Sequence, residues 1–210
     1  MAEPEGHGEA CGGGAFGQMR VDALLEAFSS ADPTPGGGGA AVLAVALSAS
    51  LCAMAARLST PQMTRAPQLA AEALSLCDVL APLGDRDAHD YLAVIAARQD
   101  PDGASDTADR RQPVADALSA ATEVPMEVID MGTRLAEMAA ELVEEGNPNL
   151  RGDALVAAVL AGAGVEAAAT LARINLAGSP DDQRHEVVRT RLDETTRSVQ
   201  RARLAAAVHL

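Results

Sequence analysis

The sequence contains no lysine and no tryptophan, and its aromatic residues are limited to Phe16, Phe28 and Tyr91. All 16 cationic residues are arginine, so the chain can supply neither a P-loop lysine nor a lysine that forms a Schiff base. A β-sandwich or barrel normally uses aromatic and β-branched side chains, whereas the Ala and Leu abundant here favour helices. These absences exclude most nucleotide hydrolases and lysine-imine enzymes and indicate an all-α protein.

Positive charge and cysteine are also scarce. The net charge is −14 and the pI is about 4.5, which excludes nucleic acid as a partner, because phosphate binding requires a basic face. The three cysteines, Cys11, Cys52 and Cys77, are odd in number and show no paired spacing. With an acidic N-terminus where a signal peptide would be basic, this pattern predicts free thiols in a reducing compartment, and therefore a cytoplasmic protein.

One long uncharged run stands out, Ala40 to Ala56. Its 17 residues fall just short of the ~20 that a membrane span requires, it lacks an aromatic belt, and many of its residues are Ala or Ser. A helix that is apolar all round, with small residues on several faces, is typical of a bundle centre. We therefore expect a buried helix and no membrane partner.

The turn before this run is rich in glycine and proline. Asp32 or Thr34 can supply an N-cap oxygen and Pro35 presets φ, while Gly36 to Gly39 allow close approach of another group. The free N–H groups of such a helix start suit an anion or a carbonyl oxygen, but the same turn also serves tight packing alone.

The rest of the chain reads as one helical domain, residues 18–210, after a disordered tail, residues 1–17. Apolar spacing predicts helices over 20–28, 40–56, 65–83 with a kink at Pro82, 87–98, 112–146 with a break at Pro125, 154–174 and 180–209, with a polar loop at 99–109. The prediction is an up-and-down bundle of about six or seven helices around two Ala-rich central ones. Small-residue faces also suit contact between subunits, so we expect a homodimer.

Polar residues gather beside the apolar helices at three further places. Asp87 and Tyr91, four residues apart, share a helix face, although a solvated acidic helix start explains them equally well. Asn147, Asn149 and Asp153 precede the second Ala-rich helix, where Asn149 or Asp153 caps the helix or the group binds a ligand. Arg173 and Asn175 end that helix, where an arginine either complements the helix dipole or binds an anion. No histidine has metal-like partners at ligand spacing, so we expect no metal and no cofactor.

Four sequence blocks, in order, resemble the cyclodeaminase/cyclohydrolase family, which includes the C-terminal domain of formiminotransferase-cyclodeaminase. They are Pro33-Thr-Pro-Gly-Gly-Gly, Asp87 with Tyr91-Leu-Ala-Val-Ile-Ala-Ala, Ala121-Thr-Glu-Val-Pro-Met-Glu-Val, and Gly146-Asn-Pro-Asn with Asp153-Ala and Arg173-Ile-Asn-Leu. The resemblance implies a helical homodimer that binds a tetrahydrofolate derivative and acts on its one-carbon bridge. Two reactions are implied: hydrolysis of methenyltetrahydrofolate to formyltetrahydrofolate, or loss of ammonia from formiminotetrahydrofolate.

The resemblance also implies roles for the candidate residues. Asp87 would act as general base and stabilise the cationic methenyl group, and Asp153 is the second candidate for this role. The residues implied in substrate binding are Pro35, Gly36, Gly37, Gly38, Tyr91, Asn147, Asn149, Arg173 and Asn175. Because no formiminotransferase domain is attached, we favour the cyclohydrolase over the cyclodeaminase.

The sequence departs from the family pattern at several positions. Gly39 and Gly152 stand where the family has serine, Leu171 stands where it has asparagine, and no lysine follows the first Ala-rich helix. Arg65, in that region, hardly deprotonates at working pH, so it would replace a proton-transferring lysine poorly. A non-catalytic folate-binding or dimerisation module is therefore the alternative to an enzyme.

Overall fold

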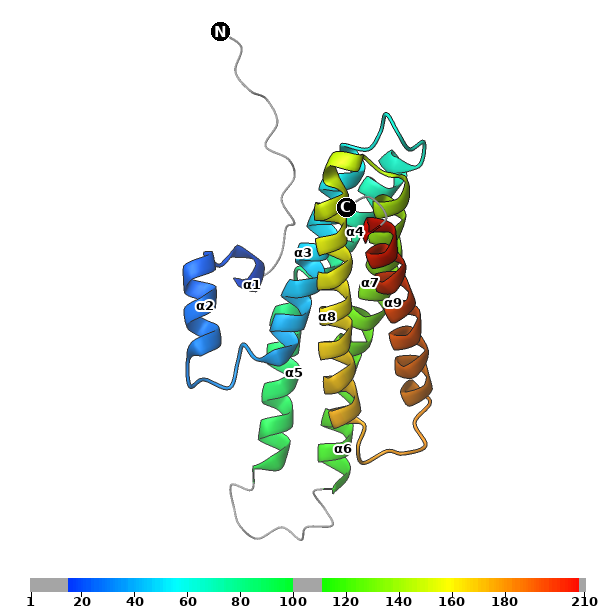
Figure 1. Cartoon of the computed structure of the whole chain (residues 1–210). Helices are drawn as coiled ribbons and strands as arrows, with labels where there is room; N and C mark the ends of the chain where they lie inside the picture. Colours follow the sequence, from blue (N-terminus) through cyan, green and yellow to red (C-terminus); the bar gives the residue numbers. More distant parts are fainter. Residues whose placement is uncertain (1–14, 100–110, 208–210) are drawn as a thin grey trace.

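The computed structural model describes residues 15–99 and 111–207 and is helical throughout, with no strand in those two stretches (Figure 1). The helices are α1 (Ala15–Gln18), α2 (Val21–Ser29), α3 (Gly37–Arg57), α4 (Ala66–Leu80), α5 (Leu83–Arg98), α6 (Arg111–Ala120), α7 (Glu123–Glu145), α8 (Arg151–Asn175) and α9 (Arg184–Ala207), with a short 3-10 helix, η1 (Pro148–Leu150), before α8. The predicted all-α bundle is confirmed.

Helices α3 and α8 lie side by side and antiparallel at the centre of the bundle, as the two uncharged Ala-rich runs predict (Figure 1). The start of α3, at Gly37, faces Leu171 near the end of α8. The hydroxyl of buried Ser48 donates to the backbone oxygen of Ala157 at 2.8 Å and so ties the two helices together. Gly164 lets the backbones approach closely, because a Cβ at this position would overlap the side chain of Val45.

Helix α7 completes the core, with α9 packed against α7 and α8, while α4 packs against α3. A Cβ on Gly132 would come within 2.5 Å of the Val165 side chain, so α7 and α8 also approach through a glycine. The buried hydroxyls of Thr133 and Thr195 lie 2.9 Å apart and connect α7 to α9. Glycine, alanine and hydroxyl contacts thus bring these helices together at short range, as small residues allow.

Two prolines split the chain as the sequence suggests, although the breaks are sharper than kinks. Pro82 is the N-cap of α5, which begins one residue later as a separate helix from α4. The predicted break at Pro125 occurs just before it, between α6 and α7, so Pro125 sits in the first turn of α7. A proline is tolerated there, because the N–H it lacks would have no intrahelical partner.

The predicted disordered tail ends too late. Residues 1–14 lie outside the described part of the chain, but Ala15–Gln18 form α1. The backbone N–H of Phe16 donates to the carboxylate of Asp85 at 3.2 Å, and its ring packs edge-on against Phe28. A lone aromatic residue in a glycine-rich stretch is the signal that would have found this contact. The predicted loop, apart from Gln99, falls outside the described residues.

The two cysteines in the described residues, Cys52 and Cys77, differ in their bonding. Cys52 is free and buried, as predicted, and burial raises the pKa of its thiol to about 12. The free-thiol prediction is wrong for Cys77, which is disulfide-bonded. The sequence pattern of odd, unpaired cysteines could not anticipate that bond.

Two segments, Gly37–Arg57 and Pro148–Asn175, are long and apolar enough to cross a membrane by length and composition. Their most apolar windows are 56% and 44% buried in the bundle, and core helices commonly pass the same test. The exposed remainder of α3 and α8 carries large apolar side chains: Leu47, Met54, Leu58, Val156, Val159 and Ile174. We call this surface the α3–α8 face.

Candidate active site

The glycine-rich turn holds a carboxylate from another helix. The N-cap of α3 is Gly36, which offers no side-chain oxygen, so neither Asp32 nor Thr34 caps the helix as predicted. Instead, Asp87 on α5 accepts a hydrogen bond from the backbone N–H of Gly39 in the first turn of α3. The positive end of α3 therefore binds an anion, and that anion belongs to the protein itself.

Gly38 is the position where this arrangement requires glycine. A Cβ built there would overlap the carboxylate of Asp87. At Gly37, the nearest atom to a Cβ would be Leu171 Cδ2 at an ordinary 3.8 Å. Close approach, rather than the flexibility of the whole run, explains the glycine beside Asp87.

Asp87 opens into a cavity of about 260 Å³ at one end of the bundle. Four helical segments and the turn before α3 contribute to its wall, and its lining residues are Pro33, Thr34, Gly36, Gly37, Gly38, Asp87, Tyr91, Ala121, Pro125, Leu171, Ile174 and Asn175. The lining is largely apolar or backbone, with a few polar groups, which is the usual composition of a small-molecule site. The structure thus brings Gly36 to Gly38, Asp87, Tyr91 and Asn175 to one cavity, and their roles in catalysis and binding remain a prediction.

The environment of Asp87 disfavours its charge. Burial raises the pKa of this carboxyl above its ordinary value, and the nearby carboxylate of Asp90 raises it further. The hydrogen bond from Gly39 opposes both effects but does not cancel them. A carboxylate with a raised pKa at a cavity wall is suited to accept and return a proton.

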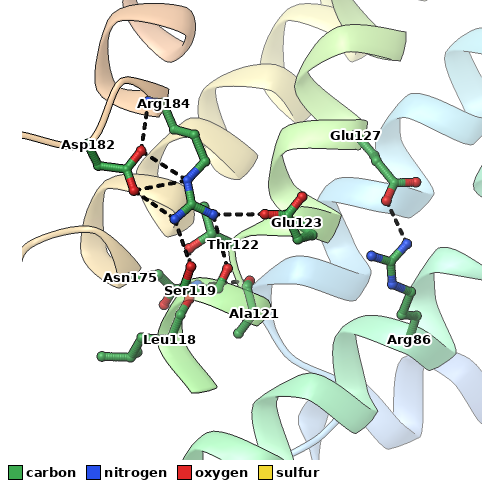
Figure 2. Close-up of polar contacts among 10 residues, drawn as sticks. All are labelled: Arg86, Leu118, Ser119, Ala121, Thr122, Glu123, Glu127, Asn175, Asp182 and Arg184. Atoms are coloured by element: carbon green, nitrogen blue, oxygen red, sulfur yellow. Dashed lines mark hydrogen bonds and ion pairs between the residues drawn. The ribbon is translucent and has the colours of Figure 1, made fainter. Parts of the chain in front are cut away.

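Asp90 is held in place beside Asp87 by its own partners. Its carboxylate lies 3.2 Å from Nδ1 of His89 and 3.9 Å from Nε of Arg86. Arg86 also donates to Glu127 on α7 at 2.6 Å, which fixes α5 against α7 (Figure 2). The charges around Asp87 are therefore set by a network that spans two helices.

Asn175, the last residue of α8, forms part of the cavity wall through a backbone contact. Its Nδ2 donates to the backbone oxygen of Ala121 at 2.9 Å, at the junction of α6 and α7 (Figure 2). Arg173 does not join it. Arg173 is exposed and lines neither this cavity nor the others found in the described residues, because two residues along a helix turn a side chain by about 200°.

The remaining predicted residues lie elsewhere. Pro35 lies between two lining residues, Thr34 and Gly36, but is not itself in the lining of the cavity. The peptide bond between Thr34 and Pro35 is cis. Asp153 lies in the first turn of α8 and Asn175 ends it, which places them about 33 Å apart along the helix axis. Within one chain, Asp87 and Asp153 therefore cannot act on the same atom.

Asn147 and Asn149 lie at that far end with Asp153, where they close a turn. Oδ1 of Asn147 accepts from the backbone N–H of Asn149 at 3.0 Å, which caps η1. Nδ2 of Asn147 donates to the backbone oxygen of Leu58 at 3.0 Å, and its backbone N–H donates to Ser59 Oγ at 2.8 Å. Asn147 thus caps η1, whereas α8 has Leu150 as its N-cap and no side-chain cap, so neither Asn149 nor Asp153 caps it. A binding role for these residues remains a prediction.

The wall near Asn175 is fixed by one arginine. Arg184, in the first turn of α9, donates to Asp182 at 2.7 Å and to Glu123 at 2.8 Å, and it also binds both oxygens of Ser119 (Figure 2). This arginine lowers the pKa of Asp182 to about 2. The contacts hold the α6–α7 junction against α9, and so position the backbone oxygen that Asn175 binds.

Sequence reasoning missed several residues of the wall. Thr34, Leu171 and Ile174 all line the cavity. Ile174 was detectable as a large apolar residue directly before Asn175, while Leu171 is one helical turn before it. Elsewhere in the two described stretches, no group of three or more His, Cys, Asp or Glu residues is placed to hold a metal ion.

Comparisons with known proteins agree on one family. A family model described as formiminotransferase-cyclodeaminase matches residues 20–194. A methenyltetrahydrofolate cyclohydrolase of Methylorubrum extorquens is 29% identical over 172 residues, which cover 79% of this chain and 83% of that protein. The crystal structure of a formiminotetrahydrofolate cyclodeaminase from Thermotoga maritima superposes with a TM-score of 0.77 at 23% identity, covering 90% of this chain and 96% of that one.

Proposed function

The chain belongs to the formiminotransferase-cyclodeaminase family, and from this membership we propose that it hydrolyses methenyltetrahydrofolate to formyltetrahydrofolate. The cyclohydrolase relative from Methylorubrum extorquens supports the choice of reaction. The observation that carries the proposal is the carboxylate of Asp87, held on a cavity wall with a raised pKa. The enzyme is proposed to act on folate in one-carbon metabolism, without a further cofactor.

The substrate offers an electrophilic carbon between two nitrogens that share a positive charge. The carboxylate of Asp87 stabilises that cation when the substrate is bound, because opposite charges attract more strongly in a partly buried site than in bulk water. Glycines 36 to 38 present backbone to the flat ring system, and Tyr91 and Asn175 border it. The lining is otherwise apolar, which suits a bicyclic ring.

The hydrolysis can be followed bond by bond. A water molecule attacks the methenyl carbon, a C–O bond forms, and Asp87 accepts a proton from the water. One C–N bond then breaks as the C–O bond becomes a double bond, the departing ring nitrogen takes a proton from Asp87, and the remaining hydroxyl proton is released to solvent, which leaves a formyl group on the other nitrogen. The product is neutral at the one-carbon unit, so one proton is released overall for each substrate cation consumed.

The test is loss of the methenyl absorbance at neutral pH, above the spontaneous rate, in wild type and in Asp87→Asn. We expect wild type to accelerate the loss and the variant to reduce turnover by at least about 100-fold, the scale of a general base. The fold should persist, because the asparagine oxygen still accepts from the Gly39 N–H. Since the folded-state pKa of Asp87 is raised, its ionised form costs stability above that pKa, so Asp87→Asn should be no less stable than wild type at pH 7.

Two results would contradict this assignment. Unchanged turnover in Asp87→Asn, with an intact far-ultraviolet circular dichroism spectrum, would remove Asp87 from the mechanism. If wild type does not accelerate the loss, ammonia release from formiminotetrahydrofolate tests the cyclodeaminase alternative. A second negative result would leave a folate-binding or dimerisation module.

We also propose that the protein works in the cytoplasm as a homodimer, paired through the α3–α8 face. Leu58 and Ile174 on this face are 53% and 62% exposed, and the uncharged run of α3 supplies no charged side chain between them. Apolar surface gathered in this way is typical of an interface. A two-fold axis perpendicular to the antiparallel α3 and α8 would bring the Asp153 end of one copy beside the Asp87 cavity of the other.

A further inference from the structure

A second cavity, of about 610 Å³, adjoins the Asp87 cavity and shares Asn175 with it. It is enclosed by α6, the turn after α8 and the start of α9. Asn175 lines both cavities, and its hydrogen bond to the Ala121 backbone oxygen marks the boundary between them. The Asp87 cavity alone is smaller than the ~300–1,000 Å³ typical of ligand sites, whereas the two together fall within that range.

The chemistry of the second cavity changes along its length. Val114, Ala115, Leu118 and Leu176 make it largely apolar, in keeping with a flat aromatic ring. One edge is formed by Arg111, at the start of α6. A ligand that fits this cavity would be aromatic at one end and anionic at the other.

Arg111 and Arg184 differ in what they are free to bind. Arg184 is committed to Asp182, Glu123 and Ser119 and serves as part of the wall. The guanidinium of Arg111 makes no hydrogen bond or ion pair with any residue in the described ranges. In a chain of net charge −14, a cation at a cavity edge that has no such partner among the described residues is a site for a carboxylate.

We propose that this second cavity receives the p-aminobenzoyl-glutamate tail of the folate substrate, with Arg111 binding a tail carboxylate. The proposal rests on the proposed function, which places the ring system beside Asp87. Asn175 then lies between the reacting ring and the tail. Arg173, expected from the sequence to bind anionic parts of the ligand, lies outside both cavities.

The test compares two substrates: methenyltetrahydrofolate, and methenyltetrahydropteroate, which has the aromatic ring but lacks the glutamate. In Arg111→Ala, we expect KM for the folate to rise about fivefold with kcat unchanged, the scale of an exposed ion pair. Arg111→Glu should raise it further by like-charge repulsion. Both changes should alter KM for the pteroate much less, because its one carboxylate is attached directly to the aromatic ring and does not extend as far as the glutamate carboxylates.

A filling variant and a matched control complete the design. Ala115→Trp should raise KM for both substrates, because both carry the aromatic ring that the tryptophan displaces. Arg189→Ala, on the exposed side of α9 where Arg189 pairs with Glu186, should change neither. Equal effects of Arg111→Ala on the two substrates, or no effect on either, would overturn the proposal.

Failure of the tail site and failure of the proposed function are distinguishable. If wild type turns over neither substrate, the function is wrong, and the tail site is then tested by binding of p-aminobenzoyl-glutamate alone. Saturable changes in the NMR signals of α6 that disappear in Ala115→Trp would support the site. An absence of such changes in wild type would overturn it.

Discussion

At the scale of a single residue, the charge of Asp87 is subject to two opposing effects. Its carboxylate completes the N-terminus of α3, where a negative charge is favourable, and it lies in partly buried surroundings beside Asp90, where that charge is unfavourable. The second effect is larger, so the pKa is raised. A general base benefits from this balance, since a higher pKa increases its ability to take a proton.

The like charge of Asp90 gives a prediction on pH dependence. Catalysis requires ionised Asp87, so kcat/KM should fall on the acidic side as Asp87 becomes protonated. Asp90→Asn removes a charge that raises the pKa of Asp87, so the acidic limb should move to lower pH, by on the order of half a pH unit. The measurement is the pH profile of kcat/KM for methenyltetrahydrofolate.

The control for this profile is Asp193→Asn, which removes an exposed carboxylate on α9. Its acidic limb should coincide with that of wild type. A shift of Asp90→Asn to higher pH, or identical profiles in all three proteins, would mean that the limb reports a group other than Asp87.

At the scale of the helices, close approach through small residues determines which faces meet. Gly164 on α8 faces Val45 on α3, and its Cβ position also lies 3.1 Å from the backbone oxygen of Ala41. A methyl group there would overpack two backbones that cannot separate without disturbing the core. The tight spacing of α3 and α8 should therefore be sensitive to a single carbon.

We predict that Gly164→Ala destabilises the fold by about 1–3 kcal/mol, although alanine is the better helix former. The measurement is the free energy of unfolding in urea. Gly152→Ala on the same helix is the matched control, because nothing lies within 4 Å of its Cβ position, and it should stabilise by up to about 1 kcal/mol. Equal effects of the two changes would show that helix propensity, rather than packing, governs α8.

The same contrast explains what the sequence could predict. The uncharged sequences that form α3 and α8 are stable only in a core or an interface, so their central position could be predicted from composition. The i,i+4 spacing of Asp87 and Tyr91 placed both on one face. Periodicity alone could not choose between Arg173 and Asn175, because it says nothing about which face of α8 meets α7.

Contacts between distant segments were also beyond the sequence. The cap that Asp87 provides for α3 joins residues about 50 positions apart, and no local capping pattern reveals it. The second cavity depends on where α6 packs against the rest of the bundle, and the sequence of α6 alone does not determine that position. Asp153 was grouped with Asp87 by chemistry, although the length of α8 already separates them in one chain.

At the scale of the whole molecule, the α3–α8 face predicts the oligomeric state. We expect Leu47→Glu, which places a charge at the centre of this face, to convert the dimer to a monomer, as measured by light scattering after gel filtration. Val187→Glu, beside the exposed Glu186 and Arg189 on α9, should leave the mass unchanged. A wild-type protein with the mass of one chain would contradict the proposed homodimer.

A two-fold axis would also decide whether Asp153 acts. If each site combines Asp87 of one chain with Asp153 of the other, Asp87→Asn and Asp153→Asn should each be inactive alone. Mixing them would form hybrid dimers in which one site carries both substitutions and the other carries neither. At random pairing, half of the dimers are hybrids, so activity should recover to about a quarter of wild type. Activity of Asp153→Asn alone would show that each site is complete within one chain and that Asp153 only begins α8. No recovery after unfolding and joint refolding would contradict a site shared between two chains.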